Sequence, residues 1–482
     1  DSPDAQRALN AARKERAFHW PFEFPEVFAA EGRGGFNAFV GNPPFLGGKR
    51  ISFRHGEVYY SFIKNMLNNT PQTTDLCVYF MSKSYHFSRT PACIGLILSD
   101  IISQGDSREN GLEYLLQQNI HIIFAKKSAN WPGQAGVKIA QINLWKGNWI
   151  GHRTLEDQEV DNINSFLQCN KEDLTPCELV NNKDKCFSGH YLMNQDFVVT
   201  AKEKEALIQA NEKNSEVIFQ YIRGDDINNL PEQLSGFYAI NFSLRSKEQC
   251  ERDYLECFNF LLKKRSVSGQ SLINKENNNK WWMYARPRPG LEAILKKVEN
   301  VIVQPFTAKY LLPTFISSRS VFAHPLVVIA PANYQVFAVI QSTIHEKWMW
   351  QYCSTSLDLF RYTANSVFLT FPFPDYDEKL EQIGNKYYTK RQGLLLSRKD
   401  SLNAIYNDFH NKKNKMAEVE QLRGLHIELD TSIIGTCGWG DLDLGHGFHE
   451  TPQGMRFTIS ETARREVLAR LLQLNHERYE EE

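Results

Sequence analysis

Between residues 36 and 147, short apolar runs alternate with stretches in which apolar residues recur at helical spacing. Apolar residues at every third or fourth position predict an amphipathic helix, whereas short β-branched runs predict strands. The pattern predicts strands at residues 36–40, 92–102, 120–124 and 137–145, and helices at residues 59–67, 76–87 and 111–118. The strand at 92–102 is apolar throughout, as in a strand that is buried on both faces. Strands that alternate with helices favour a mostly parallel, doubly wound sheet of the α/β class.

The character of the chain changes several times after this region. A polar stretch predicts a connector with some helix, and short aromatic and β-branched runs with many turns then indicate a mixed α/β module. A charged, helical region follows, and the chain ends with an amphipathic helix at 460–475 that Ser460 is suited to cap. We therefore expect four regions, at residues 1–150, 151–215, 216–375 and 376–482.

Length, charge and cysteines narrow the class of protein. A chain of 482 residues favours more than one domain. The formal net charge of −1 gives no general case for a nucleic-acid partner, so any DNA contact has to come from local basic surface. Nine cysteines without a Cys-x-x-Cys pair indicate reduced thiols in a cytoplasmic protein. The apolar runs fall far short of the ~20 residues that span a membrane. Because the chain begins at Asp1, we expect a segment of a longer protein.

The sequence NPPF at residues 42–45 directly follows the first predicted strand. Its two prolines fix φ at roughly −65° and remove two backbone donors. Each proline also pushes the residue before it out of the α region. The loop is therefore stiff and presents acceptors without donors. The Asn42 side-chain oxygen and the Pro43 carbonyl are suited to accept from one exocyclic amino group, and Phe45 offers a flat apolar face for a base.

The alternative interpretation of NPPF is a rigid turn between a strand and a loop. Its context favours a binding site, because an open α/β sheet binds its ligands at the carboxyl ends of its strands. The following residues 46–49, LGGK, continue the loop at that position.

The run FNAFVGNPPF at 36–45 resembles the large adenine-specific (N6) DNA methyltransferases of restriction–modification and phage-defence systems. The runs FHW at 18–20 and FPEVF at 24–28 precede it and belong to the same resemblance. In that family the Asn and the first Pro hold the target amino group, and the aromatic residue stacks on the flipped base. The resemblance gives these roles to Asn42, Pro43 and Phe45, with Pro44 completing the motif. The family more often has Asp at position 37 and frequently Tyr at position 45. Neither difference removes the acceptors or the stacking face.

The resemblance covers nearly the whole chain. Its further stretches are DLCVYF at 75–80, GLILS at 95–99, WPG at 131–133, RYT at 361–363, TFPFP at 370–374, DLDLGHGFHE at 441–450 and GMRFTIS at 454–460. In the family, the counterpart of WPG and the strand after it closes the other side of the base pocket. Trp131 is therefore a candidate for a second stacking face, and a Trp that only packs its loop is the alternative. The fold that the resemblance implies is a partial Rossmann-like methyltransferase sheet, then a target-recognition module and a helical C-terminal region.

The resemblance implies S-adenosyl-L-methionine as the methyl donor and double-stranded DNA as the substrate. An amino group inside a duplex is reached only when its base is flipped out, at a cost of a few kcal/mol. The family holds its cofactor with a Gly-rich loop after a strand, and no run in this sequence fits. EGRGG at 31–35 precedes a strand, and GHG at 445–447 lies in the C-terminal block. We therefore expect a second polypeptide or an N-terminal half to carry the cofactor site, and no measurable S-adenosylmethionine binding by this chain alone.

Residues 263–288 hold seven basic residues and one acidic residue, interleaved with Trp281, Trp282 and Tyr284. Basic side chains neutralise phosphates, and aromatic ones pack against sugars or bases. The alternative is a solvated basic loop with core tryptophans. The candidate DNA-binding residues are Lys263, Lys264, Arg265, Lys280, Arg286, Arg288 and Arg361. The run YIRGDD at 221–226 resembles the entry to the recognition domain, and its carboxylates favour a capped turn over a metal nuclease.

Other interpretations remain open. His446 and His449 with Asp441 and Asp443 suggest a metal site, but their spacing favours a structural turn, and we predict no metal. Asn-Pro-Pro also occurs in enzymes that methylate protein amides, although these lack the roughly 330 residues that follow the predicted sheet here. A non-catalytic DNA-specificity subunit of a defence complex is the third interpretation, because it needs no cofactor loop.

Overall fold

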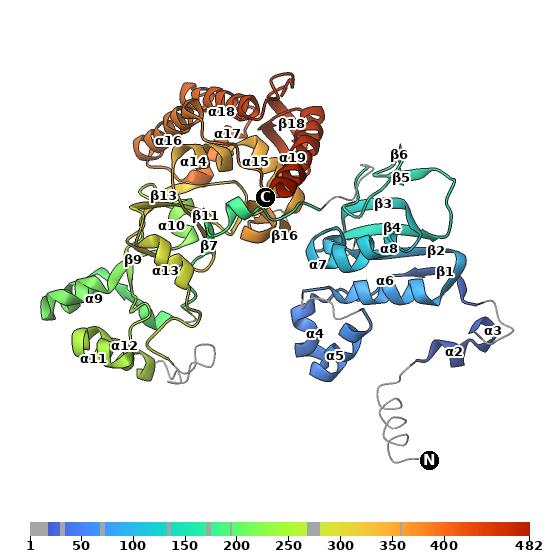
Figure 1. Ribbon diagram of the computed structural model, residues 1–482, viewed down its shortest axis with the longest axis horizontal. Helices are drawn as coiled ribbons and strands as arrows, with labels where there is room; N and C mark the ends of the chain where they lie inside the picture. The colour runs from blue at the N-terminus through green and yellow to red at the C-terminus, as the bar shows by residue number, and fades with distance from the viewer. Residues whose placement is uncertain are drawn as a thin grey trace, which may run out of the picture. The chain divides into compact units, whose positions relative to one another are not determined.

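The structure is a computed structural model. It describes all residues except 1–17, 29–33, 68–72, 133–135, 170–174, 193–194, 268–279 and 357–358. The chain divides into two compact units, Asp1–Leu174 (unit 1) and Thr175–Glu482 (unit 2) (Figure 1).

Unit 1 is built on a six-stranded sheet with the strand order β1-β2-β4-β3-β5-β6. Its strands are β1 Phe36–Gly41, β2 Ser88–Ser99, β3 Ile120–Asn130, β4 Lys138–Lys146, β5 Arg153–Leu155 and β6 Gln158–Val160. β1 pairs parallel with β2, and β3 pairs parallel with β5, whereas β4 lies antiparallel between β2 and β3. β1, β2, β3 and β5 therefore run in one direction. Their carboxyl ends share one side of the sheet, called the carboxyl edge below.

The helices of unit 1 cover the sheet and follow its carboxyl edge. They are α2 Trp20–Glu23, α3 Pro25–Phe28, α4 Gly48–His55, α5 Glu57–Asn65, α6 Leu76–Phe87, η1 Asp100–Ser103, α7 Gly105–Ser107, η2 Arg108–Glu113 and α8 Tyr114–Leu116. α6 contacts β2 and η2, and one core holds Met81, Ile94, Leu98 and Leu112 between them. This packing places the loop between β1 and α4 at the carboxyl edge.

The α/β class and the strand–helix order predicted for this region are confirmed. The predicted mostly parallel sheet is wrong, because β4 and β6 pair antiparallel with their neighbours and the sheet is mixed. α6 has the predicted bounds because Asp75 caps it, with the Asp75 carboxylate accepting from the Cys77 N–H. The strand at 92–102 was expected to be buried on both faces, and this is true of one face only. Ile94 and Leu98 are fully buried, whereas Ile97 on the other face is half-buried. α6 and η2 pack on the face that carries Ile94 and Leu98, so only this face is closed.

Unit 2 combines small sheets with long helices. Its sheets have the orders β14-β9-β10-β8, β13-β11-β15-β7, β12-β17-β16 and β18-β19. The strands are β7 Cys186–Ser188, β8 Val198–Thr200, β9 Ile218–Ile222, β10 Phe237–Ile240, β11 Asn300–Pro305, β12 Thr307–Ala308, β13 Thr314–Ser317, β14 Ser320–Phe322, β15 Leu326–Ile329, β16 Ser354–Ser356, β17 Leu359–Arg361, β18 Gly447–Thr451 and β19 Gly454–Thr458.

Many helices of unit 2 lie at its two ends, with α9, α11 and α12 at one end and α16 to α19 at the other, whereas α10 and α13 lie between them (Figure 1). The helices are α9 Ala201–Ala210, α10 Gly224–Asn229, α11 Lys247–Asp253, α12 Leu255–Val267, α13 Pro289–Leu295, α14 Tyr334–Gln341, α15 Thr343–Tyr352, α16 Glu378–Arg398, α17 Leu402–Phe409, α18 Ala417–Thr436 and α19 Glu461–Glu481. Short turns of helix are η3 Val180–Asn182, η4 Gln195–Phe197, η5 Glu212–Glu216 and η7 Ala364–Phe368. Ser460 caps α19 as predicted, because its Oγ accepts from the Ala463 N–H at 3.2 Å.

The division into two units differs from the four expected regions. The expected connector at 151–215 is shared between the units, because β5 extends the sheet of unit 1 while β8 pairs with β10 in unit 2. The expected boundary at 375 is also crossed by packing. A single hydrophobic cluster runs from Ile222 to Leu471 and includes residues of α14, α16 and α18. The mixed module and the helical region therefore share one core.

Candidate active site

The NPPF residues lie in the loop between β1 and α4, at the carboxyl edge of the unit 1 sheet. Asn42 is exposed and its side chain forms no hydrogen bond to any described residue, whereas Pro43 is buried. Phe45 is half-buried and packs against the core of unit 1. The loop therefore combines a fixed backbone with an available amide side chain. This combination is what binding an amino group requires.

Asp75 holds the end of this loop. Its Oδ1 accepts from the Leu46 N–H at 3.3 Å and from the Cys77 N–H at 3.0 Å. The Leu46 carbonyl in turn accepts from the Leu76 N–H at 2.9 Å. The Asp75 N–H donates to the Ser107 Oγ at 3.1 Å. Since Asp75 is 3% exposed, this network is shielded from water and ties the loop to α6 and α7.

Asp100 lies at the same edge, directly after β2. Gly41 at the end of β1 pairs with Leu96, and β2 continues to Ser99, so Asp100 follows the strand next to Asn42. Burial raises the pKa of the Asp100 carboxyl, and the neighbouring Lys138 and Lys127 offset part of that shift. Asp100 was not among the predicted site residues, because a single Asp after a strand forms no motif in the sequence.

Trp131 directly follows β3, so it also lies at the carboxyl edge. It is half-buried, and its N–H donates to the Val137 carbonyl at 3.1 Å. In the strand order, β3 is separated from β1 by β2 and β4, which corresponds to about 14 Å between the β1 and β3 backbones. The structure therefore places Trp131 and Asn42 on one side of the sheet but three strands apart.

The basic segment at 263–288 divides between surface and core. Lys264 Nζ donates to the Val198 carbonyl at 2.7 Å, and Arg265 is 5% exposed and donates to the Trp281 carbonyl at 3.2 Å. These two side chains tie α12 to the core of unit 2, where Arg265 is buried away from a phosphate while Lys264 stays half-buried. Trp281 and Tyr284 are also buried, as the core interpretation requires.

The remaining basic candidates lie at the surface of unit 2. Lys263, Lys280, Arg286 and Arg361 are exposed, and Arg288 is half-buried. The Arg286 guanidinium lies over the Tyr191 ring at 5.0 Å, and Arg361 lies over Phe306 at 5.1 Å. Lys275, the one basic residue of the 263–288 segment that is not a candidate, lies outside the described residues.

The predicted capped turn after β9 is confirmed. Asp226 accepts from the Arg223 N–H at 2.8 Å and from the Arg223 guanidinium at 2.8 and 3.0 Å. Asp226 is 1% exposed, so this carboxylate is fully engaged by Arg223.

The four residues considered as a metal site each contact a residue outside that set. His449 Nε2 lies 2.8 Å from the Gly445 carbonyl, Asp443 accepts from the Gly445 N–H at 3.0 Å, and Asp441 pairs with Arg470. His446 Nε2 lies 2.9 Å from Asp430 Oδ2. In the part of the chain that the structure describes, no three His, Cys, Asp or Glu side chains converge as metal ligands would.

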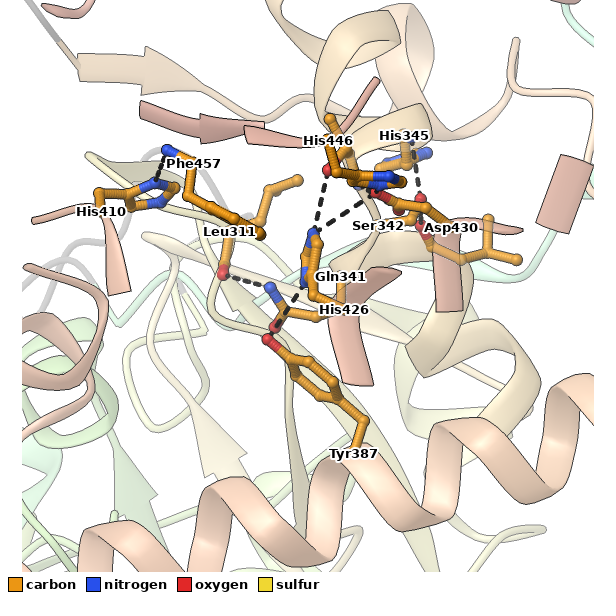
Figure 2. Close-up of polar contacts among 12 residues, drawn as sticks. Leu311, Gln341, Ser342, His345, Tyr387, His410, His426, Asp430, His446 and Phe457 are labelled. Atoms are coloured by element: carbon orange, nitrogen blue, oxygen red, sulfur yellow. Dashed lines mark hydrogen bonds and ion pairs between the residues drawn. The ribbon is translucent and has the colours of Figure 1, made fainter. Parts of the chain in front are cut away.

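His446 belongs instead to a buried polar network between α15, α16, α18 and the segment that enters the C-terminal hairpin. Figure 2 shows Asp430 and His446 beside His426, whose ring reaches towards Tyr387. The Thr343 N–H donates to Asp430 Oδ1 at 2.9 Å. Burial alone would raise the pKa of Asp430, but His426, His446 and the Thr343 hydrogen bond bring it below its ordinary value. This network joins elements of unit 2 and is far in sequence from NPPF.

A cleft of about 710 Å³ opens beside β10 and α13 in unit 2. Glu292 lines it and accepts from Asn241 Nδ2 at 2.9 Å and from Ser243 Oγ at 3.2 Å. Burial alone would raise the pKa of Glu292, but His190 and these hydrogen bonds lower it. The cleft also exposes the basic residues Lys296, Lys297 and Arg319. Its residues come from distant parts of the sequence, so no local pattern indicated it.

The region that contains the NPPF loop is similar to known proteins. Residues 3–129 match the family described as Eco57I restriction-modification methylase. The structure of the Type IIL restriction-modification enzyme MmeI in complex with DNA is similar to 95% of this chain, with a TM-score of 0.70 and 16% identity. The cryo-EM DrdV–DNA complex is similar to 76% of this chain and 44% of that chain at 12% identity, but its TM-score of 0.38 supports no argument. No curated protein matches the chain in sequence.

The chain spans 59% of the MmeI chain, and at this identity the likeness concerns the fold alone. In the described parts of the chain, no helix is long and apolar enough to cross a membrane. The family match includes the whole β1–NPPF–α4 region. Residues 3–129 are therefore similar to the Eco57I restriction-modification methylase family, and the chain shares its fold with a Type IIL restriction-modification enzyme.

Proposed function

We propose that this chain takes part in S-adenosylmethionine-dependent methylation of adenine N6 in double-stranded DNA, within a restriction–modification or phage-defence system. Its own part is to hold the flipped adenine at Asn42–Phe45. The observation that carries this proposal is the exposed, unengaged Asn42 amide beside the buried Pro43, at the carboxyl edge of the sheet.

The chemistry follows from two acceptors on one amino group. Asn42 Oδ1 and the Pro43 carbonyl accept the two N–H bonds of adenine N6, which draws the nitrogen towards tetrahedral geometry and frees its lone pair. The half-buried Phe45 ring offers a face on which the base can stack. Trp131, which follows β3 at the same edge, remains a candidate for the second face. No strong general base is needed, because the methylated ammonium is acidic enough to lose its proton to solvent.

The methyl donor requires residues that this chain does not offer. Bound S-adenosylmethionine would supply an electrophilic methyl group. Gly34 and Gly35, however, precede β1, and Gly445 and Gly447 lie in unit 2, so neither pair forms a loop after a strand of the unit 1 sheet. The residues present therefore do not fit the cofactor, and we assign none of them to it.

β1 is where the cofactor half would join. Among the described residues β1 pairs with β2 on one side and with no strand on the other, and Val40 on β1 is 92% exposed. An apolar outer strand with a free row of backbone groups is suited to pair with another strand. We propose that a second polypeptide or an N-terminal half pairs here and carries the Gly-rich loop.

Unit 2 is proposed to recognise the DNA sequence. Its exposed cations Lys263, Lys280, Arg286 and Arg361 are the phosphate-contact candidates that the structure leaves at the surface. Arg288 is half-buried and is a weaker candidate.

The test replaces Asn42. The chain is combined with the polypeptide that carries the Gly-rich half, and N6-methyladenine is measured in duplex DNA by mass spectrometry. We expect Asn42→Ala to lower the rate by about 100-fold or more, in the range found when one preorganised hydrogen-bonding group is removed from an active site. Asn42→Asp keeps an acceptor and is expected to retain part of the activity.

Asn148→Ala is the matched control, because Asn148 is an exposed Asn of unit 1 away from the carboxyl edge. Wild-type methylation by Asn42→Ala would refute the role of Asn42. Methyl groups found on protein amides but not on DNA would replace the proposal with the amide-methyltransferase interpretation. A micromolar binding isotherm for S-adenosylmethionine with the chain alone would contradict the proposed division of the site.

A further inference from the structure

One face of α4 carries four exposed side chains that nothing in the fold explains. Lys49, Arg50, Phe53 and Arg54 are all exposed, and their spacing of one, four and five residues places them on one side of the helix. The opposite side is anchored by Ile51, which is 0% exposed and packs in a core cluster with residues of α5 and α6. The face defined by these four residues is called the α4 face below.

The cations of the α4 face are not neutralised by the described residues. Lys49, Arg50 and Arg54 form no ion pair with any residue that the structure describes, and Glu57 at the start of α5, the nearest acidic residue in sequence, does not pair with Arg54. Phe53 between them is 94% exposed and makes no ring contact with the described residues. An aromatic ring surrounded by three unpaired cations is poorly suited to an apolar protein partner, because that partner would have to desolvate the charges.

The α4 face lies close to the base-holding loop. α4 begins three residues after Phe45, and the loop between them is fixed through Leu46 and Asp75. Phe53 is five residues into the helix, which is about 7.5 Å along its axis. A duplex whose adenine reaches Asn42 therefore has its neighbouring phosphates within reach of the α4 face.

We propose that the α4 face binds the DNA duplex beside the flipped adenine. In this inference, which rests on the proposed function, Lys49, Arg50 and Arg54 neutralise phosphates. Phe53 packs into the base-pair step that the adenine leaves. Apolar side chains that enter unstacked steps and basic residues that contact the backbone are the two elements that distorted DNA requires.

The cations are tested through the salt dependence of binding. The chain binds a generic 30-base-pair duplex, and the logarithm of the affinity is plotted against the logarithm of the salt concentration. Each phosphate contact contributes about −0.9 to this slope. We therefore expect the magnitude of this slope to fall by about 3 in the triple variant Lys49→Gln, Arg50→Gln, Arg54→Gln. Arg50→Lys keeps the charge and should keep the slope. An unchanged slope in the triple variant overturns the proposal.

Phe53 is tested on a duplex with one abasic position, which imitates the vacated step. We expect the wild-type chain to bind this duplex tighter than the intact one, by at least about 5-fold, as for stacking on an exposed ring. Phe53→Ala should abolish this preference. Phe62→Ala is the matched control, because Phe62 is 64% exposed on α5 and lies outside the α4 face. A preference that survives Phe53→Ala, or that Phe62→Ala removes equally, overturns the role of Phe53.

These measurements need neither the cofactor nor the recognition sequence, so their outcome is separate from the methylation test of Asn42. If the α4 variants bind DNA like the wild type while Asn42→Ala loses methylation as expected, only the proposal for the α4 face is refuted. A wild-type chain without salt-dependent DNA binding also refutes the α4 face, and the role of Asn42 is then decided by the methylation test alone.

Discussion

The Leu46 N–H donates to Asp75 Oδ1 at 3.3 Å, across 29 residues of sequence. This bond joins the end of the NPPF loop to the residue that caps α6. The buried Asp75 carboxylate therefore holds the loop at the candidate active site and also accepts from a backbone N–H in the first turn of α6. The position of the NPPF loop and the stability of α6 thus depend on the same side chain.

Asp75→Ala is expected to lower both methylation and stability. Loss of an N-cap costs about 1 kcal/mol, and the freed loop no longer holds Asn42 and Pro43 in place. The rate should fall by at least about 10-fold, measured with the reconstituted enzyme, and the free energy of unfolding should be compared by urea titration. Asp75→Asn keeps an acceptor oxygen and is the control. Equal activity in Asp75→Ala and the wild type would show that the Leu46 bond does not position the loop.

Asp100→Asn is expected to stabilise the protein at neutral pH. Burial raises the pKa of Asp100 in the fold, so the unfolded chain loses this proton first as the pH increases. The contribution of Asp100 to stability therefore falls as the pH rises above about 4, the ordinary pKa of Asp. The advantage of Asp100→Asn should be larger at pH 7 than at pH 4. Unfolding titrations at the two pH values measure it, and a variant that is less stable than the wild type at pH 7 would contradict this reasoning.

Local signals account for what the sequence predicted correctly. The β1–NPPF–α6 order and the cap at Ser460 depend on neighbouring residues, so periodicity and capping rules predict them. Contacts between distant residues leave no such pattern. The antiparallel placement of β4 belongs to this group, as does the Leu46–Asp75 bond.

Charge patterns were less informative than loop motifs. The basic segment at 263–288 could be read from the sequence, but a count of cations does not show that Arg265 folds inward to the Trp281 carbonyl. The α4 face was missed for the opposite reason, because three cations around Phe53 form no motif until the helix is oriented by Ile51.

His345 is expected to make unit 2 sensitive to acid. Burial lowers the pKa of His345 to about 3. Its Nε2 lies 2.9 Å from the Tyr362 hydroxyl. Below an ordinary histidine pKa of about 6.5, the unfolded chain takes up a proton that the fold does not, so stability falls as the pH decreases. This one residue contributes a slope of about 1.4 kcal/mol per pH unit in that range.

The variant His345→Gln should unfold more easily at pH 7, because it loses ring packing, but its stability should change less between pH 6 and pH 4.5. Urea titrations at both values give the two slopes. His55→Gln, at an exposed histidine of α4, serves as the control. Parallel pH dependence in His345→Gln and the wild type would mean that other groups cause the acid sensitivity.

Two glycines of α16 are expected to respond in opposite ways to alanine. Gly384 is buried where α16 crosses α14, and a Cβ there would lie 2.1 Å from the Tyr334 carbonyl oxygen. The helices have to separate to relieve this contact, so Gly384→Ala should destabilise the protein by about 1–3 kcal/mol, as overpacking does. Gly393 is exposed in the same helix, and a Cβ there meets nothing within 4 Å. Gly393→Ala should therefore stabilise the protein by up to about 1 kcal/mol through helix propensity. Urea unfolding of both variants measures the difference, and a shift of the same sign in both would show that the close approach of α14 and α16 does not set the role of Gly384.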